Sequence, residues 1–95
     1  MKEKNIHQKI ISYLTSQPET IAYKNHGGMY SLVGLSDITA VIKGRAIFIE
    51  VKAPGKESTL SSPQLKFLQK ATEAGAIAFM ATSIEGVKQR LRELL

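Results

Sequence analysis

The chain of 95 residues contains no cysteine. Disulfide bonds and thiolate metal sites are therefore excluded, and a reducing cytoplasm is the expected compartment. No apolar run approaches the roughly 20 residues that a membrane-spanning helix needs. The first ten residues, MKEKNIHQKI, carry charged and amide side chains where a signal peptide would need a continuous apolar region. We therefore expect a cytoplasmic protein that does not enter a membrane.

Repeats, low-complexity tracts and linkers are also absent, so residues 1–95 are expected to form one domain with a single modest core. A hydrophobic content of 43% and a charged content of 22% are ordinary for a globular protein and give no sign of disorder. The net charge of +5 favours a polyanionic partner, of which nucleic acid is the commonest. Charge alone does not decide the matter, because many basic proteins of this size bind nothing in particular.

Hydrophobic spacing and turn signals predict three helices and four strands. The expected order is a helix over residues 4–16, strands over 20–24, 37–42 and 45–52, a helix that begins near 61–64, a strand over 76–81 and a last helix from about 84. The glycine-rich stretch 25–36 is expected to be irregular. Because a helix separates the last two strands, we expect a right-handed crossover and parallel pairing between them. The predicted fold class is α/β, in the form of an α+β mixed sheet flanked by helices in the order α-β-β-β-α-β-α.

Local signals mark the ends of the second and third helices. Ser61 as N-cap, followed by Pro63 in the first turn, is a strong start signal, and Gly75 is a natural residue just past the end. Residues 82–85, TSIE, resemble a capping box that opens the last helix. The buried face of the second helix is expected to contain four apolar residues, Leu65, Phe67, Leu68 and Ala71.

Residues 34–52, GLSDITAVIKGRAIFIEVK, predict two short apolar strands joined by a tight turn. With Lys43-Gly44 as a two-residue loop, counting outwards places Asp37 directly opposite Glu50. Side chains opposite each other in an antiparallel pair have Cβ atoms about 4.5–5.5 Å apart, close enough for two carboxylates to share a metal ion. Glu50 and Lys52 are two residues apart and point to the same face. Two carboxylates and one amine are therefore expected to converge.

Charges at strand ends often do no more than reach solvent, and an isolated E-x-K occurs in many unrelated proteins. Here, however, residues 46–51, AIFIEV, are apolar on both faces apart from Glu50, which implies a strand buried on both sides. Its terminal charges would then lie at the rim of a core. Two like charges in such a place need a counter-ion, and a divalent cation would supply it.

These residues resemble the PD-(D/E)XK nuclease superfamily and, more narrowly, the VRR-NUC group of virus-type replication-repair nucleases. The resemblance rests on three segments in this order: G-x-S-D ending at Asp37, I-E-V-K ending at Lys52, and S-P-Q ending at Gln64. It covers nearly the whole chain, and the combination is much more specific than the degenerate superfamily motif alone. Ser36 stands where the family usually has proline, which leaves the acid in place. The resemblance implies a restriction-endonuclease-like core.

The same resemblance implies a bound Mg²⁺ or Mn²⁺ ion. Asp37 and Glu50 would be its ligands, with the backbone carbonyl of Val51 as a third oxygen. Lys52 would orient or activate the attacking water and offset charge in the transition state.

Four further residues stay open between two roles or lack an assigned role. Gln64 resembles a family glutamine that supports the active site, but Ser61-x-x-Gln64 is itself a capping box. Glu3 matches the family's acid on the first helix, which contacts the metal directly or through water, and it could equally be a solvated acid favoured by the helix dipole. His26 lies in a loop, where a structural or phosphate-contacting histidine is commoner than a general base, and it is left outside the catalytic set. His7 has no partner that the sequence identifies.

The function expected on these grounds is metal-dependent endonucleolytic hydrolysis of DNA. The substrate would be branched, such as a four-way junction, and recognised by its shape. A chain this small suggests a two-fold homodimer, and the resemblance suggests a bacterial or phage-encoded protein of replication and repair. The alternatives are a non-catalytic DNA-binding accessory module that keeps the fold, and an enzyme that cleaves RNA. The candidate contacts to flanking phosphates are Lys24, Lys43, Arg45 and Lys56, each of which could instead be a solubilising surface charge.

Overall fold

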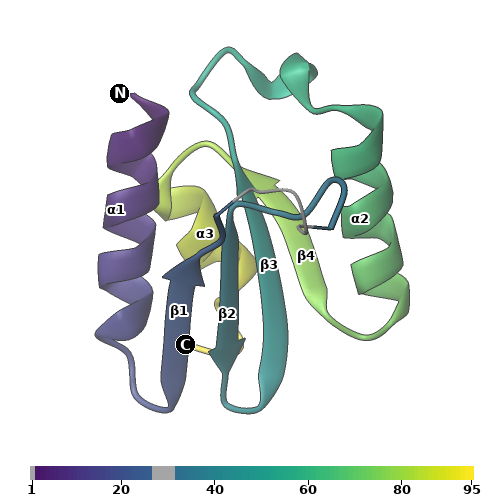
Figure 1. The fold of residues 1–95 in the computed structure, drawn as a ribbon. Helices are drawn as coiled ribbons and strands as arrows, with labels where there is room; N and C mark the ends of the chain where they lie inside the picture. The colour runs from purple at the N-terminus through teal and green to yellow at the C-terminus, as the bar shows by residue number, and fades with distance from the viewer. Residues whose placement is uncertain (1, 27–31) are drawn as a thin grey trace.

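The computed structural model of the chain describes residues 2–26 and 32–95 (Figure 1). Residues 27–31, which belong to the stretch expected to be irregular, lie outside the described residues. The helices and strands are α1 (Glu3–Thr15), β1 (Thr20–Lys24), β2 (Ile38–Ile42), β3 (Arg45–Val51), the short 3₁₀ helix η1 (Glu57–Thr59), α2 (Ser62–Glu73), β4 (Ile77–Ala81) and α3 (Ile84–Arg90). The predicted order of helices and strands is confirmed. Within the described ranges, no helix combines the length and the apolar character that crossing a membrane requires.

The four described strands form one mixed sheet in the order β1-β2-β3-β4. The β1–β2 and β2–β3 pairs are antiparallel and the β3–β4 pair is parallel, as predicted. Ile42 lies opposite Arg45, so the loop between β2 and β3 has the two predicted residues. Lys43 and Gly44 both have positive φ, 50° and 83°, which suits the right-handed twist of a two-residue hairpin. The predicted register of the hairpin is therefore confirmed.

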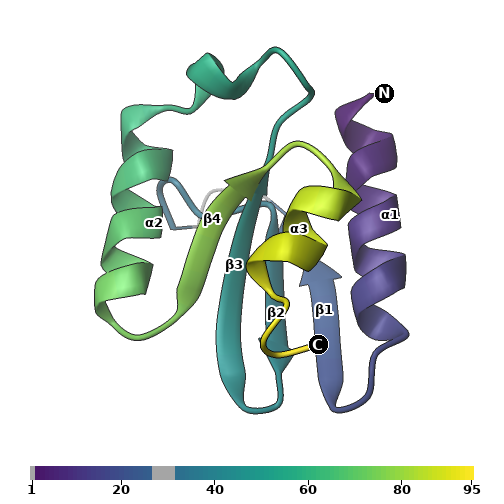
Figure 2. The same cartoon turned by 180° about the vertical axis from the view of Figure 1, so that it is seen from behind.

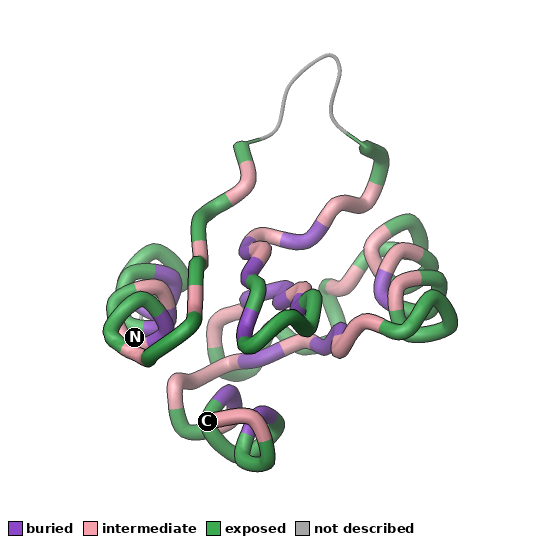
Figure 3. Tube along the Cα trace, turned by 90° about the horizontal axis from the view of Figure 1, so that it is seen from below, coloured by how far each residue is buried: buried purple, intermediate pink, exposed green. Residues whose placement is uncertain are grey.

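The core lies on one face of the sheet, which α1 and α3 cover (Figures 1 and 2). Alternate residues of β2 and β3 point to this face and are fully buried against Ile6, Ile10 and Leu14 of α1. Burial alternates along β2, whose five residues are in turn buried, intermediate, buried, exposed and buried. Figure 3 shows the buried segments of the helices on the sides that face the middle of the molecule. Helix α2 packs on the other face, where the rings of Phe48 and Phe67 meet edge to face with centroids 5.2 Å apart. The sheet thus lies between two layers of helices, with α1 and α3 on one face and α2 on the other (Figures 1 and 2).

Several local predictions need correction. Leu65 was expected on the buried face of α2 but is 46% exposed, whereas Leu68 is buried. The reason is that α2 covers only the β3–β4 side of the sheet, so one narrow stripe of the helix is buried (Figure 1). The N-cap of α3 is Ser83, whose Oγ accepts a hydrogen bond from the backbone N–H of Gly86, so the expected capping box at 82–85 does not form. Asp37 lies just before β2 and not within it.

Candidate metal centre and active site

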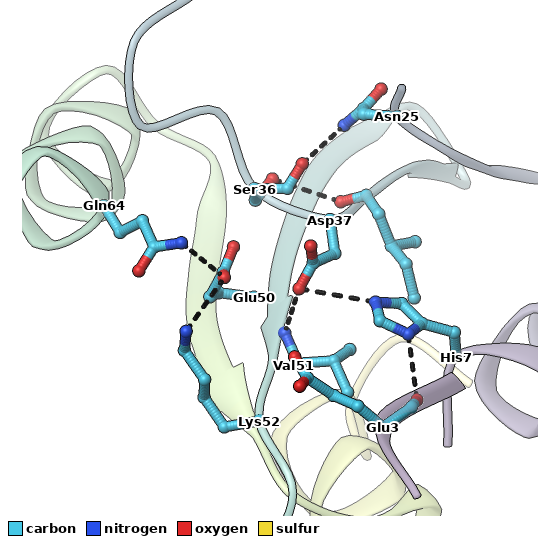
Figure 4. Close-up of polar contacts among 10 residues, drawn as sticks. Glu3, His7, Asn25, Ser36, Asp37, Glu50, Val51, Lys52 and Gln64 are labelled. Atoms are coloured by element: carbon cyan, nitrogen blue, oxygen red, sulfur yellow. Dashed lines mark hydrogen bonds and ion pairs between the residues drawn. The ribbon is translucent and has the colours of Figure 1, made fainter. Parts of the chain in front are cut away.

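Asp37, Glu50, Lys52 and Gln64 come together at one end of the sheet, where β2 begins, β3 ends and α2 begins (Figure 4). The hairpin brings the first two together, because Ile38 pairs with Ile49 and the next residues outwards are Asp37 and Glu50. Gln64 arrives from α2 on the side of Glu50. The groups expected to converge from the sequence do so in space.

Asp37 is held by backbone hydrogen bonds on both sides. Its Oδ2 accepts a bond from the N–H of Val51 at 2.8 Å, and its carbonyl accepts one from the N–H of Asn25 at 2.7 Å. The Asn25 amide also donates to the carbonyl of Ser36 and to the hydroxyl of Thr39. The side chain of Asp37 is 28% exposed, so one edge of the carboxylate remains open to a ligand.

Glu50 is nearly fully buried, with a relative exposure of 2%. Its pKa is raised from 4.5 to about 7, first because burial removes water from the carboxylate and second because the Asp37 charge is close. Lys52 acts in the opposite direction and lowers this pKa, with its Nζ 3.8 Å from Glu50 Oε2. The amine does not offset the two other effects. The site therefore holds more negative charge than its own cation can balance.

Gln64 caps α2 and also contacts Glu50, and its support of an active site stays a prediction. Its Oε1 accepts a hydrogen bond from the N–H of Ser61 at 2.9 Å, and Ser61 Oγ accepts one from the N–H of Gln64 at 3.2 Å, which completes the predicted capping box. Its Nε2 donates to Glu50 Oε2 at 2.9 Å. The capping bond fixes which way the amide faces, and so it presents the NH₂ group to the buried carboxylate.

The buried polar atoms at this site test whether a cation fits. Among residues 2–26 and 32–95, two buried side-chain polar atoms have no hydrogen-bond partner, and they are Glu50 Oε1 and His7 Nε2. Both belong to this site (Figure 4). Buried polar atoms in folded proteins are almost always paired, so an orphaned oxygen of a buried carboxylate beside Asp37 is what an ion-binding site would leave. The residues present therefore fit a divalent cation.

The site is not a ready-made cage of side chains. In the described ranges, no three His, Cys, Asp or Glu residues surround one point as metal ligands. An ion would draw on backbone carbonyl oxygen and water in addition to the carboxylates, which is the usual coordination of Mg²⁺. Val51 follows Glu50 at the end of β3, and the role of its carbonyl as a ligand stays a prediction.

His7 joins the site although the sequence assigned it no partner. It is buried on α1, its Nδ1 lies 2.9 Å from the carbonyl of Glu3, and its Nε2 lies 3.4 Å from Asp37 Oδ2. Its place beside Ile6 on the buried stripe and four residues after Glu3 was the available signal. Glu3 itself is exposed, and its contact with the site is through this backbone carbonyl.

The four candidate phosphate contacts fall into two pairs. Lys24 ends β1 opposite Ile38, and Lys56 lies in the loop that follows β3, so both are at the end of the sheet that carries the acids. Lys43 and Arg45 lie at the hairpin turn, five or more residues along β3 from Glu50, which is about 17 Å or more. The structure does not bring this second pair to the acids, and Arg45 Nε donates to the carbonyl of Gly75 at 2.8 Å.

A cavity of about 410 Å³ opens beside Asp37. Gln64, Asn25 and His26 also line it. His26 thus stands near the site but outside the group of charges.

Gly34 connects the loop before Asp37 to the start of α2. Its φ is +78°, and a Cβ built on it would lie 2.2 Å from the carbonyl oxygen of Pro63. The two backbones touch at this point, and no side chain can be inserted between them. This contact explains why residue 34, three positions before Asp37, is a glycine.

We expect Gly34→Ala to destabilise the protein by clearly more than Gly44→Ala. Both glycines have positive φ, so each alanine should cost about 1 kcal/mol in backbone strain. Only Gly34 has backbone atoms in the way, because nothing lies within 4 Å of a Cβ at Gly44. Urea unfolding of the two variants measures the difference, and equal losses would contradict the contact between the loop and α2.

The raised pKa of Glu50 predicts how the metal-free protein responds to pH. Between pH 4.5 and about 7 the folded protein binds a proton at Glu50 that the unfolded chain has released. The free energy of unfolding should therefore fall as the pH rises through this window. Unfolding curves in EDTA at a series of pH values measure this slope, with Glu50→Gln as the reference. A wild-type curve with the same slope as the Glu50→Gln curve would show that Glu50 is not buried as described.

Comparison with known proteins supports the fold. No protein-family model and no curated protein matches the chain. Its structure is similar to a solved structure named "VRR_NUC domain protein", with a TM-score of 0.78 and 15% sequence identity. The match covers 99% of this chain and 88% of that chain. The chain therefore has a VRR-NUC-like, restriction-endonuclease-like fold.

Proposed function

We propose that this protein is a metal-dependent endonuclease that hydrolyses phosphodiester bonds of DNA. The observation that carries the proposal is the pairing of the buried Glu50 with Asp37 at one end of the sheet, with an orphaned carboxylate oxygen and the amine of Lys52 beside them. The fold shared with a VRR_NUC domain protein supports it.

Asp37, Glu50 and the carbonyl of Val51 are the residues that would hold Mg²⁺ or Mn²⁺. When bound, the ion would supply a water of lowered pKa and would polarise the phosphate. Gln64 holds one oxygen of Glu50 through its NH₂ group and leaves Oε1 for the ion. Lys52 is anchored by its backbone N–H on the carbonyl of Ala81, which keeps its ammonium near Glu50 to position water and offset charge on the phosphate.

The substrate class follows from the charge and from the position of the site. Lys24 and Lys56, at the same end of the sheet as the acids, are the cations that would contact neighbouring phosphates. A cavity lies beside Asp37 and the start of α2, and we propose that the site recognises the shape of branched DNA. Binding of this kind weakens steeply as salt is raised.

A non-catalytic DNA-binding module is the alternative function. It would need basic residues but no buried carboxylate whose pKa lies near 7. Without a metal ion, the buried Glu50 carboxylate beside Asp37 lowers the free energy of unfolding at neutral pH. A second negative charge at this place would also repel the phosphates that a DNA-binding module must contact. The metal-binding pair therefore favours the catalytic function.

We expect Glu50→Gln and Lys52→Ala each to reduce DNA cleavage at least about 100-fold, because each removes a group that acts in the transition state. DNA binding should change little. The assay compares branched, linear and single-stranded DNA and RNA in Mg²⁺ or Mn²⁺ against EDTA. Lys43→Ala is the matched control, since it removes a lysine at the far end of the sheet and should cleave normally. Cleavage that survives both site variants would contradict the proposal. Preferential cleavage of RNA would show that the substrate is RNA and not DNA.

We also propose that two copies form a two-fold dimer whose sites cut opposite strands of a branched substrate. Ile21 and Tyr23 on the edge strand β1 are 64% and 53% exposed, next to the exposed Val41 on β2. Such an apolar patch is typical of an interaction surface.

Sedimentation at micromolar concentration measures the dimer directly. We expect the wild type to be dimeric, and we expect Ile21→Lys to shift it to monomer because a charge would be buried in the interface. Val41→Thr, a milder change in the same patch, should leave most of the dimer intact. A fully active wild-type monomer would remove the dimer from the proposal.

A further inference from the structure

An open apolar cavity of about 690 Å³, which we call the α2 cavity, lies between Phe48 of β3 and Phe67 of α2. We propose that the α2 cavity holds an unpaired base of the nucleic-acid substrate, and that Lys66 and Lys70 contact the phosphates next to that base. Such a site would select a substrate by an unpaired nucleotide as well as by shape. It rests on the nucleic-acid substrate of the proposed function.

Two aromatic rings give the α2 cavity a surface on which a base can stack. Phe48 and Phe67 both line it, and their rings meet edge to face with centroids 5.2 Å apart. Both residues are only partly buried, so ring surface remains open to the cavity. Aromatic side chains are the usual stacking surface for unpaired bases, and they accept any base because every base has a π-face.

Positive charge without a partner lines the same cavity. Lys66 and Lys70 are four residues apart and therefore lie on one side of α2, where two like charges repel each other. The ion pairs found within residues 2–26 and 32–95 include neither lysine. No acidic residue is among the described residues that line the cavity. The α2 cavity is therefore complementary to a group with one apolar, aromatic part and one anionic part, and a nucleotide is such a group.

The size of the α2 cavity also fits one nucleotide. Sites for small ligands measure about 300–1,000 Å³ and are mostly apolar, with a few polar groups that fix the orientation of the ligand. The α2 cavity lies within this range, and apart from the two lysines and the two aromatic rings its described lining consists of Leu32, Val33, Pro63 and Ala71.

The α2 cavity adjoins the cavity beside Asp37. Leu32, Val33 and Pro63 line both of them. Pro63 directly precedes Gln64, which lines the cavity beside Asp37. A base held in the α2 cavity would therefore bring its own strand next to the acids. An unpaired base can enter without the cost of breaking a base pair, so the arrangement favours substrates in which a base near the cleaved bond is already unpaired.

NMR of the phenylalanine rings tests the α2 cavity without a metal ion and without cleavage. The chain has three phenylalanines, and Phe79 belongs to the core on the other face of the sheet, so it is an internal control. In EDTA, we expect a single-stranded oligothymidylate to shift the ring signals of Phe48 and Phe67 and to leave those of Phe79 unchanged. An abasic oligomer with the same number of phosphates should not shift them.

Three results of this titration would overturn the inference. The rings of Phe48 and Phe67 could respond to neither oligomer, or they could respond equally to both, which would show that the base is not held there. Ring signals that shift with protein concentration in the absence of DNA would place a second copy of the chain in the cavity.

Affinity for branched DNA provides the second measurement, again in EDTA. A junction with an unpaired thymidine at the branch point is compared with the same junction carrying an abasic residue there. We expect the wild type to bind the first about 10-fold more tightly, because only the thymidine can stack. Equal affinities would contradict the base site.

Two double variants with the same change in charge test the lysines. We expect Lys66→Gln/Lys70→Gln to weaken binding of both junctions, because each keeps its phosphates. Lys9→Gln/Lys88→Gln removes two exposed lysines from α1 and α3, on the other face of the sheet, and should weaken binding clearly less. Equal weakening in the two variants would overturn the role of Lys66 and Lys70.

Cleavage of the same junctions in Mg²⁺ or Mn²⁺ separates this inference from the proposed function. Cleavage by a wild type whose rings do not respond to DNA would overturn the base site and leave the nuclease standing. Base-dependent binding with no cleavage in either metal would overturn the nuclease and leave the base site standing. A protein that neither binds nor cleaves would overturn both.

Discussion

The burial of one carboxylate beside another at the end of a hairpin is the constraint on which the site depends. Glu50 is 2% exposed, and the nearby Asp37 adds to the effect of burial in raising its pKa. Without a cation this arrangement costs stability at neutral pH. The neighbouring groups are arranged around that charge, with the Gln64 amide and the Lys52 ammonium on Glu50 and the Val51 N–H on Asp37. They moderate the charge, but they leave Oε1 of Glu50 unpaired.

Segments far apart in the sequence share this site because their backbones are locked together. The Gly34 backbone touches Pro63, which ties the loop before Asp37 to the first turn of α2. The capping box of that turn then sets the orientation of Gln64 toward Glu50. On the other side, the carbonyl of Glu3 sets the orientation of His7 toward Asp37. The first turns of α1 and α2, on opposite faces of the sheet, thus orient His7 toward Asp37 and Gln64 toward Glu50.

Much of this arrangement could be predicted from the sequence, because it depends on local rules. A two-residue loop at Lys43-Gly44 and strict alternation fix the register, and the register places Asp37 and Glu50 together. The position of Lys43 and Arg45 at the turn, remote from the acids, follows from the same register. The sequence could place His7 on the buried stripe of the first helix but could not place it against Asp37, because no local rule says how α1 lies on the sheet. The exposure of Leu65 likewise depends on how much of the sheet α2 covers, which periodicity does not determine.

The central claim is that a divalent ion binds between Asp37 and Glu50. Anomalous diffraction from crystals grown with MnCl₂ measures the position of such an ion directly. The account predicts one strong manganese peak within coordination distance of both carboxylates, at the end of β3 and beside Lys52. Manganese found elsewhere, or two carboxylates that project to different faces of the sheet with no ion between them, would contradict it.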